Sequence, residues 1–295
     1  MKKYFLLIFF FILLPNQKVN SQYSFNNKNE VAIYNIISGA LIGGIGALIN
    51  NNHKDKKIVA FGKGFYKGAL SGLVIFSGKD LVSKFPETNN YAYLSGGKLL
   101  ALTGSSMLEN TVENKRLFEK LHYNIGFVRM EFYPYNKFKV KSRIMPISLS
   151  TTIWLFTKYN LSVKNTLYTG NFIFYNEKDR KNKNGSTTIG TAFGNNILFS
   201  ANTAIARKEL IITHEMLHVF QLNSFSFSNS FFFKLENRCL GNYNFYKWYQ
   251  KYFYTDYEVL TFKTLYNISS YYYNLENNNY RENIFESEAL FMMNR

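Results

Sequence analysis

The chain has 295 residues, a formal net charge of +16 and a single cysteine. This length suits one large domain, or a small helical piece plus a main domain, and the single Cys239 excludes an intramolecular disulfide framework, so we expect it to be a small buried residue. Because the basic residues are scattered rather than gathered in one stripe, the composition also argues against a nucleic-acid partner, and it favours an anionic membrane surface or a plain solvated surface.

The N-terminus has the three zones of a secretory signal peptide. Lys2 and Lys3 precede an apolar run over residues 4–14, and a polar stretch with the small residue Ser21 follows. The apolar run is shorter than the roughly 20 residues that a helix needs to cross a bilayer. We therefore predict a signal peptide over residues 1–22, with an uncleaved anchor as the alternative. The prediction implies export, to the periplasm, the outer membrane or the medium.

Residues 23–110 form a glycine-rich region with helical spacing. Its three segments are 31–50, 62–82 and 95–108. Small residues four positions apart lie on one face of a helix and let two backbones approach closely. The small residues are Gly39, Gly43, Gly44, Gly46, Gly64, Gly68, Gly72, Gly97, Ala101 and Ser105. We predict a close-packed helical hairpin that is buried in the protein or rests on a membrane surface; insertion into the membrane is the alternative.

Residues 123–200 change to a strand-like pattern. The segments 127–133, 138–144, 161–167, 171–175 and 196–200 are rich in β-branched and aromatic residues with partial alternation. Turn-forming stretches over 134–137 and 182–185 favour antiparallel hairpins. The region therefore predicts an antiparallel sheet of about six strands. The fold class predicted for the chain is α+β, with helices again from residue 203 to the C-terminus.

The segment 203–222 is predicted to be a helix and contains the run His214-Glu-Met-Leu-His218. On a helix, His214 and His218 lie one turn apart on one face, so both imidazoles can bind one ion at about 2.0–2.1 Å. Glu215 lies one residue round from His214, where its carboxylate can take a proton from an attacking water. The pattern predicts a Zn²⁺-binding helix with Glu215 as general base. The alternative is a pair of hydrogen-bonded histidines with no metal role.

This run resembles the signature of zincin metallopeptidases. The later stretch Glu286-Ser-Glu-Ala289 resembles the glutamate helix of the gluzincin branch that includes the prenyl-protein and heat-shock membrane peptidases. In that branch a glutamate is the third zinc ligand, and an alanine and usually an aspartate follow it. The resemblance implies that Glu286 completes the ligand set, with Glu288 as the alternative. Leu290 stands where the family usually has aspartate, which puts catalytic competence in doubt.

The resemblance covers roughly residues 195–295 and implies a zincin-like metallopeptidase domain over 111–295, with C-terminal helices over 229–295. It also implies a peptide or protein substrate, for which the stretch 194–200 is the expected edge strand. The expected function is an exported, envelope-associated zinc metallopeptidase. A non-catalytic envelope or membrane-associated protein with a structural or vestigial zinc site is the alternative. The sequence contains no Gly-x-Ser-x-Gly elbow and no phosphate-binding glycine loop, and it leaves the oligomeric state open.

Overall fold

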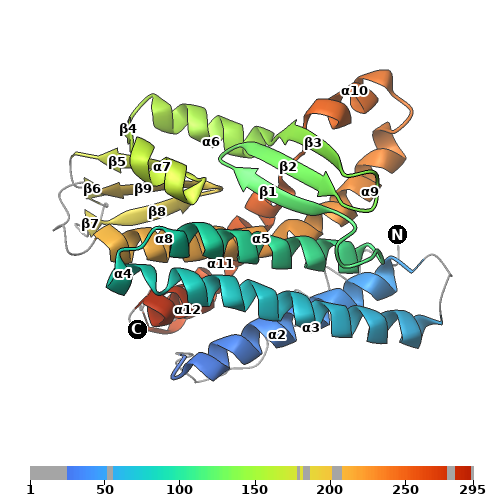
Figure 1. Ribbon diagram of the computed structural model, residues 1–295, viewed down its shortest axis with the longest axis horizontal. Coiled ribbons are helices and arrows are strands. Elements are labelled where there is room, and N and C mark those ends of the chain that lie inside the picture. Colours follow the sequence, from blue (N-terminus) through green and yellow to red (C-terminus); the bar gives the residue numbers. More distant parts are fainter. Residues whose placement is uncertain are drawn as a thin grey trace.

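The computed structural model describes residues 25–51, 56–177, 180–181, 187–200, 208–277 and 283–293. The signal peptide predicted over 1–22 and the turn predicted over 182–185 lie outside these residues. Long helices and small sheets make up the described part, so the α+β class is confirmed. The helices α5 and α8 lie between the N-terminal helices and the strands (Figure 1).

The three glycine-rich segments are helices, as predicted, and each is longer than its predicted range. They are α2 (Lys28–Ile49), α3 (Lys57–Val82) and α5 (Ala92–Val112), with the short α4 (Phe85–Thr88) between the last two. A Cβ atom at Gly68 would overlap the carbonyl oxygen of Gly39, and one at Gly78 would lie 2.6 Å from the carbonyl oxygen of Gly97. The glycines therefore allow α2 to pack on α3, and α3 on α5, at backbone contact distance.

Two helical stretches have the length and apolar composition of membrane spans. They are Lys28–Ile49 and Lys57–Thr88. Both also pack in the protein: α2 packs on α3, and α3 packs on α5 and α8. Length and composition alone do not distinguish a span from a helix of a folded core, so the choice between a buried hairpin and a membrane-associated one stays a prediction.

The first sheet is an antiparallel meander in the order β1-β2-β3. Its strands are β1 (Leu121–Ile125), β2 (Val128–Tyr133) and β3 (Lys139–Ile144). The strands predicted over 127–133 and 138–144 and the turn between them are confirmed. The next element, α6 (Pro146–Phe156), was not predicted; its proline stands in the first turn, where the missing N–H costs nothing.

The second sheet has the order β4-β5-β9-β8. Its strands are β4 (Asn160–Leu161), β5 (Phe172–Asn176), β8 (Gly190–Phe193) and β9 (Asn196–Ser200). A third, separate pair joins β6 (Arg180–Lys181) to β7 (Thr187–Thr188) in antiparallel fashion. The prediction of one antiparallel sheet was wrong in its detail, because the strands divide among separate sheets and β5 pairs with β9 in parallel.

Two further predictions in this region were wrong. The segment 161–167 is mostly the helix α7 (Val163–Thr169), which ends at Gly170 with φ 65°. A glycine in the left-handed region is a common helix stop, and the exposed Val163 and Leu167 bury too little surface to hold a strand. The stretch 194–200 is not an edge: β9 lies between β5 and β8 and is buried along its whole length. A strand covered on both faces reads as a continuous apolar run, and the edges of this sheet are β4 and β8.

The C-terminal part is helical from residue 208, as predicted, and the predicted start at residue 203 lies outside the described residues. It contains α8 (Lys208–Ser224), the 3-10 helix η2 (Phe225–Ser228), α9 (Asn229–Leu240), α10 (Asn244–Tyr252), α11 (Tyr257–Asn277) and α12 (Ile284–Met293). Cys239 is exposed on α9, so the expectation of a buried cysteine was wrong. The helix α9 buries only its first turn, and position 239 lies in its exposed half.

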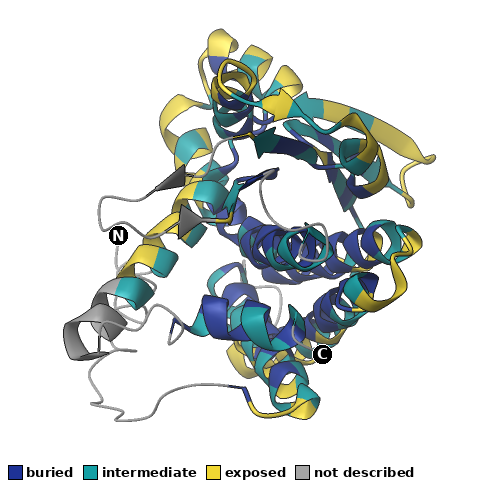
Figure 2. Cartoon of the chain, turned by 90° about the vertical axis from the view of Figure 1, so that its left-hand side faces the viewer, coloured by how far each residue is buried: buried dark blue, intermediate teal, exposed yellow. Residues whose placement is uncertain are grey.

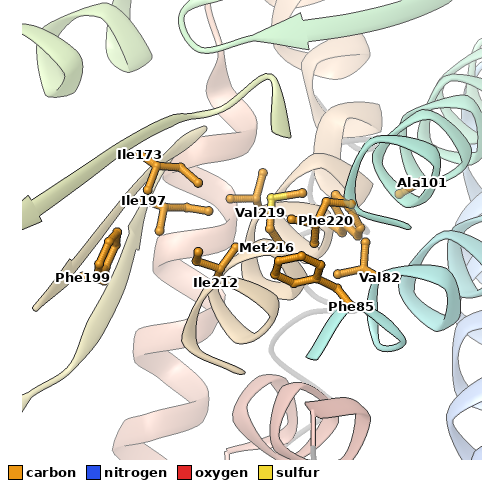
Figure 3. Close-up of a cluster of buried hydrophobic side chains, with 11 residues drawn as sticks. Val82, Phe85, Ala101, Ile173, Ile197, Phe199, Ile212, Met216, Val219 and Phe220 are labelled. Carbon is orange, nitrogen blue, oxygen red and sulfur yellow. The ribbon is translucent and has the colours of Figure 1, made fainter. Parts of the chain in front are cut away.

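One hydrophobic cluster joins the regions on both sides of residue 110. Figure 3 shows side chains from α3, α4 and α5 meeting side chains from β5, β9 and α8. The buried members are Val82, Phe85, Leu94, Ala101, Ile173, Ile197, Phe199, Ile212, Met216, Val219 and Phe220. Buried residues accordingly gather on the central helices, and exposed ones on the outer helices (Figure 2). The helix α8, which carries the histidine motif, is packed in this shared core.

Candidate metal centre

The helices α8 and α12 bring three predicted ligands together. His214 and His218 lie one turn apart on α8, and Glu286 reaches them from the first turn of α12. The two imidazole Nε2 atoms are 3.1 Å apart, and the Glu286 carboxylate oxygens lie 3.2 Å from His214 Nε2 and 3.1 Å from His218 Nε2. Phe285, Ala289 and Met292 are buried and hold α12 in place.

The three distances match the ligand set of a small tetrahedral ion. Ligands at about 2.0–2.1 Å from a tetrahedral metal are separated from one another by roughly 3.3 Å. The three observed separations, 3.1, 3.1 and 3.2 Å, are close to that value. Two imidazole nitrogens and a carboxylate are also a donor set that zinc and other divalent transition metals bind. The residues present therefore fit one divalent metal ion.

The electrostatics of the cluster also favour a cation. Burial on its own would raise the pKa of Glu286, but hydrogen bonds from His214 and His218 hold that pKa far below its usual range. Burial would lower the pKa of His218, yet its hydrogen bond to Glu286 and the charge of that carboxylate raise it to about 9. Three electron-rich atoms thus converge on one point, where either a proton or a metal ion is stabilised.

The side chain of Glu215 extends from α8 toward the edge strand β8. Burial raises its pKa above the ordinary value, and the nearby His214 and His218 only partly oppose this. The backbone of Ala192 forms a hydrogen bond to the Glu215 carboxylate. A Cβ atom at Gly190 would lie 2.5 Å from Glu215 Oε1, so the glycine leaves the space that the carboxylate fills. A carboxylate with a raised pKa beside a metal site is suited to accept and return a proton.

Glu288, the alternative third ligand, points away from the imidazoles. Its carboxylate is 1% exposed and pairs with Lys79 Nζ of α3 at 2.7 Å. Two positions apart on a helix, Glu286 and Glu288 face different neighbours. The structure therefore brings Glu286, and not Glu288, to the two histidines.

Two residues that the sequence did not indicate hold the ligands in place. Tyr266 of α11 donates a hydrogen bond of 2.6 Å from its hydroxyl to Glu286 Oε1. Gln221, one turn after His218, contacts His218 Nδ1 through its Oε1 at 2.8 Å. Partners of this kind orient the ligands of metal sites. Tyr266 gave no signal among the 23 tyrosines of the chain.

Of the remaining histidines, His53 lies outside the described residues, and His122 belongs to a different cluster. His122 lies on β1 with its Nδ1 2.9 Å from Ser106 Oγ and 3.4 Å from Glu109 Oε2. It takes no part in the candidate metal centre.

No family model, no curated protein and no solved structure matches this chain. The class of protein is therefore defined by its fold and site: an α+β protein in which two adjacent helices present a His₂Glu cluster suited to a divalent metal.

Proposed function

We propose that this chain is an exported zinc metallopeptidase that hydrolyses peptide bonds, with His214, His218 and Glu286 as zinc ligands and Glu215 as general base. The observation that carries the proposal is the meeting of these three ligand atoms, within 4.8 Å of one another, beside a buried carboxylate of the same helix. The gluzincin branch that the sequence resembles also uses two histidines of one helix and a glutamate of a later helix as its zinc ligands. Export is supported by the N-terminal sequence pattern.

Zinc bound at this cluster would polarise a substrate carbonyl and lower the pKa of a water molecule. Glu215 would take the proton from that water and pass it to the leaving amine. Its raised pKa suits both steps, because a group that accepts and then returns a proton works best near the operating pH. Tyr266 would keep Glu286 oriented through its hydroxyl.

The edge strand β8 is suited to bind an extended peptide beside Glu215. In the described part of the chain β8 ends its sheet, and Ser200 N donates to Ile189 O on the β9 side. Since backbone groups of an antiparallel strand alternate in direction, those of Gly190 and Ala192 face away from β9. The Ala192 N–H donates to Glu215 and the Gly190 carbonyl accepts from Thr191 Oγ1, so a substrate strand would pair through the Gly190 N–H and the Ala192 carbonyl. A substrate strand can pair with such an edge, which favours a peptide substrate over a small molecule.

A second function is favoured by the burial of the cluster. Glu215 is 5% exposed and Glu286 is 2% exposed, while the side chain of His214 is 16% exposed. A metal held in so enclosed a place would also serve a non-catalytic envelope protein as a structural ion. The two functions differ in whether the metal keeps an open position.

Zinc stoichiometry and the Glu215→Gln variant separate these functions. For a peptidase we expect one zinc ion per chain, and in Glu215→Gln we expect retained zinc with hydrolysis of a fluorogenic peptide library reduced by about 10²–10⁴-fold. Glu209→Gln, on the same helix, is the control and should keep full activity. Bound zinc with no hydrolysis by the wild type would support the structural ion, and a wild type that binds no zinc would refute both functions.

A further inference from the structure

A chain of buried polar contacts leads from His218 to the glycine-rich helices. It runs from His218 through Gln221 of α8 and Glu288 of α12 to Lys79 of α3 and Asn35 of α2. All five residues are nearly buried, with Lys79 2% and Glu288 1% exposed. The chain thus connects the candidate metal centre with two helices that the zincin resemblance does not cover.

The donors and acceptors in this chain fix the orientation of His218. Both amide hydrogens of Gln221 are used, because its Nε2 donates to Phe285 O at 2.9 Å and to Glu288 Oε2 at 2.8 Å. Gln221 Oε1 is consequently the acceptor that faces His218 Nδ1 at 2.8 Å. The imidazole therefore keeps a hydrogen on Nδ1. Its Nε2 is directed at Glu286, and a metal ion would take the place of the hydrogen that Nε2 shares with this carboxylate in the metal-free protein.

Glu288 can orient Gln221 only because Lys79 and Asn35 hold its carboxylate. Lys79 Nζ contacts the two Glu288 oxygens at 2.7 and 2.9 Å, and Asn35 Nδ2 donates to Oε1 at 2.7 Å. Lys79 Nζ also donates to Asn35 Oδ1 at 2.9 Å. Burying this ion pair is costly, so a purely structural element would be served as well by apolar residues. The Lys79–Glu288 pair instead lies where it fixes the side-chain amide of Gln221.

Resting on the proposed function, we propose that Lys79, with Asn35, is a positioning residue of the metal centre: it holds Glu288 so that Gln221 keeps His218 Nδ1–H bonded and His218 Nε2 directed at the metal. The glycine-rich helices thereby complete the site. Gly72 allows this, since a Cβ atom there would overlap the carbonyl oxygen of Asn35 and push α2 from α3. A helical region that looks separate in sequence contributes to the metal centre.

A matched control is present elsewhere in the chain. Lys120 and Glu109 form a second buried Lys–Glu pair, with 2.6 Å between Lys120 Nζ and Glu109 Oε1, that makes no contact with the three ligands. Lys79→Met and Lys120→Met each remove one buried lysine from a carboxylate, so both are expected to lower stability. The loss should be smaller in Lys120→Met, because Glu109 keeps Arg129 at 2.8 Å. Only the first is expected to change metal binding.

The first measurement is the Zn²⁺ affinity of the purified chain by chelator competition. We expect Lys79→Met and Gln221→Leu to weaken Zn²⁺ binding by roughly 10–100-fold, and Lys120→Met to stay within about twofold of the wild type. Adding Glu288→Gln to Lys79→Met removes both charges and keeps an amide oxygen for Gln221, so it should recover most of the lost affinity. Folded Lys79→Met with wild-type affinity would overturn the proposal.

The second measurement needs no metal. In the metal-free chain with ¹⁵N-labelled histidine, we expect a slowly exchanging His218 Nδ1–H resonance in the wild type and in Lys120→Met. It should be lost in Gln221→Leu and exchange faster in Lys79→Met. A wild type that binds no Zn²⁺ but shows this pattern would refute the proposed function and leave the positioning role supported. An unchanged resonance in Lys79→Met would overturn the positioning role alone.

Discussion

Two buried clusters in this protein are built from similar residue types and differ in their charges. The sheet-side cluster lies between α5 and the first sheet and contains Glu109, Lys120, His122, Arg129, Glu131 and Arg143. The metal-site cluster lies between α8 and α12 and contains His214, His218 and Glu286. Each cluster joins a carboxylate to a histidine in a place that water scarcely reaches.

The clusters differ in where their positive charge comes from. In the sheet-side cluster Arg129 lies 2.8 Å from Glu109 and 3.0 Å from Glu131, so the acids are neutralised by the protein itself. Burial and the charge of Arg129 lower the pKa of His122 to about 4, which keeps this imidazole neutral. In the metal-site cluster Glu286 faces two imidazoles and raises the pKa of His218 to about 9. A built-in cation is typical of a structural network, and ligand atoms that converge without one are typical of a candidate cation site.

Removing one acid from each cluster tests this difference most strongly. Glu286→Ala deletes a ligand, and we expect it to weaken Zn²⁺ binding by more than the roughly 100-fold that changes behind the ligands produce. Glu131→Ala leaves Arg129 and Arg143 with one acid fewer, and breaking a buried pair on one side costs about 3–5 kcal/mol. Chelator competition and urea unfolding of both variants measure the two effects.

The comparison predicts that each variant affects mainly one property, either Zn²⁺ affinity or stability. Glu131→Ala should keep the Zn²⁺ affinity of the wild type as long as it is folded. Glu286→Ala should lose far more metal affinity than metal-free stability. If both variants lost metal to the same extent, the two clusters would not be functionally distinct.

Acidification tests the neutral state of His122. Its pKa falls from the ordinary 6.5 to about 4 on folding, so the unfolded chain takes up a proton that the folded chain refuses. Stability from this residue is complete above pH 6.5 and is lost as the pH falls toward 4, by about 3 kcal/mol in all. The carboxylates Glu109 and Glu131, whose pKa values are lowered, add to the loss below their ordinary 4.5.

Urea unfolding between pH 7 and 5 isolates the histidine when the wild type is compared with His122→Gln. The raised pKa values of His218, about 9, and Glu258, about 8, also make stability depend on pH in this window, but that contribution is common to both proteins. As the pH falls from 7 to 5, the wild-type unfolding free energy should fall relative to that of His122→Gln. Equal slopes in the two proteins would show that His122 is not the group that titrates.

The candidate metal ligands could be predicted because their signal is local. The spacing of His214 and His218 needs only one turn of helix to place both imidazoles on one face. Glu286 followed from a short motif on a helix whose apolar side, with Phe285 and Ala289, packs against the protein. The glycine helices were predictable for the same reason, since spacings of four residues report directly on one face.

The partners behind the ligands could not be predicted, because their contacts join distant segments. Lys79 and Glu288 are 209 residues apart in the sequence. A lysine in an apolar, glycine-rich helix is a signal that some acid partner exists, but nothing local identifies which. The topology of the second sheet could not be predicted for a similar reason. The parallel pairing of β5 with β9 depends on a crossover, and the edge position of β8 depends on where the other strands lie.

The smallest predicted effect concerns the packing of α2 on α3, which supports the metal-site cluster and not the sheet-side cluster. Gly72→Ala places a Cβ atom against the carbonyl oxygen of Asn35 and 3.0 Å from Ile36 Cα, so α2 must move from α3. We expect a loss of about 1–3 kcal/mol, with a few-fold weaker Zn²⁺ binding as Asn35 and Lys79 separate. Gly62→Ala is the matched control, because the added Cβ would meet no atom within 4 Å beyond the backbone of its own helix and its chain neighbours.

The two alanines should therefore differ in the sign of their effect on stability. Gly62→Ala in an exposed helix interior should stabilise the protein by about 0.4–1 kcal/mol and leave Zn²⁺ affinity unchanged, since the alanine only restricts the unfolded chain. The sheet-side cluster does not use the α2–α3 contact, so the pH dependence attributed to His122 should be the same in both variants. Should Gly72→Ala alter that pH dependence and spare Zn²⁺ binding, the glycine helices would support the structural cluster instead of the metal centre.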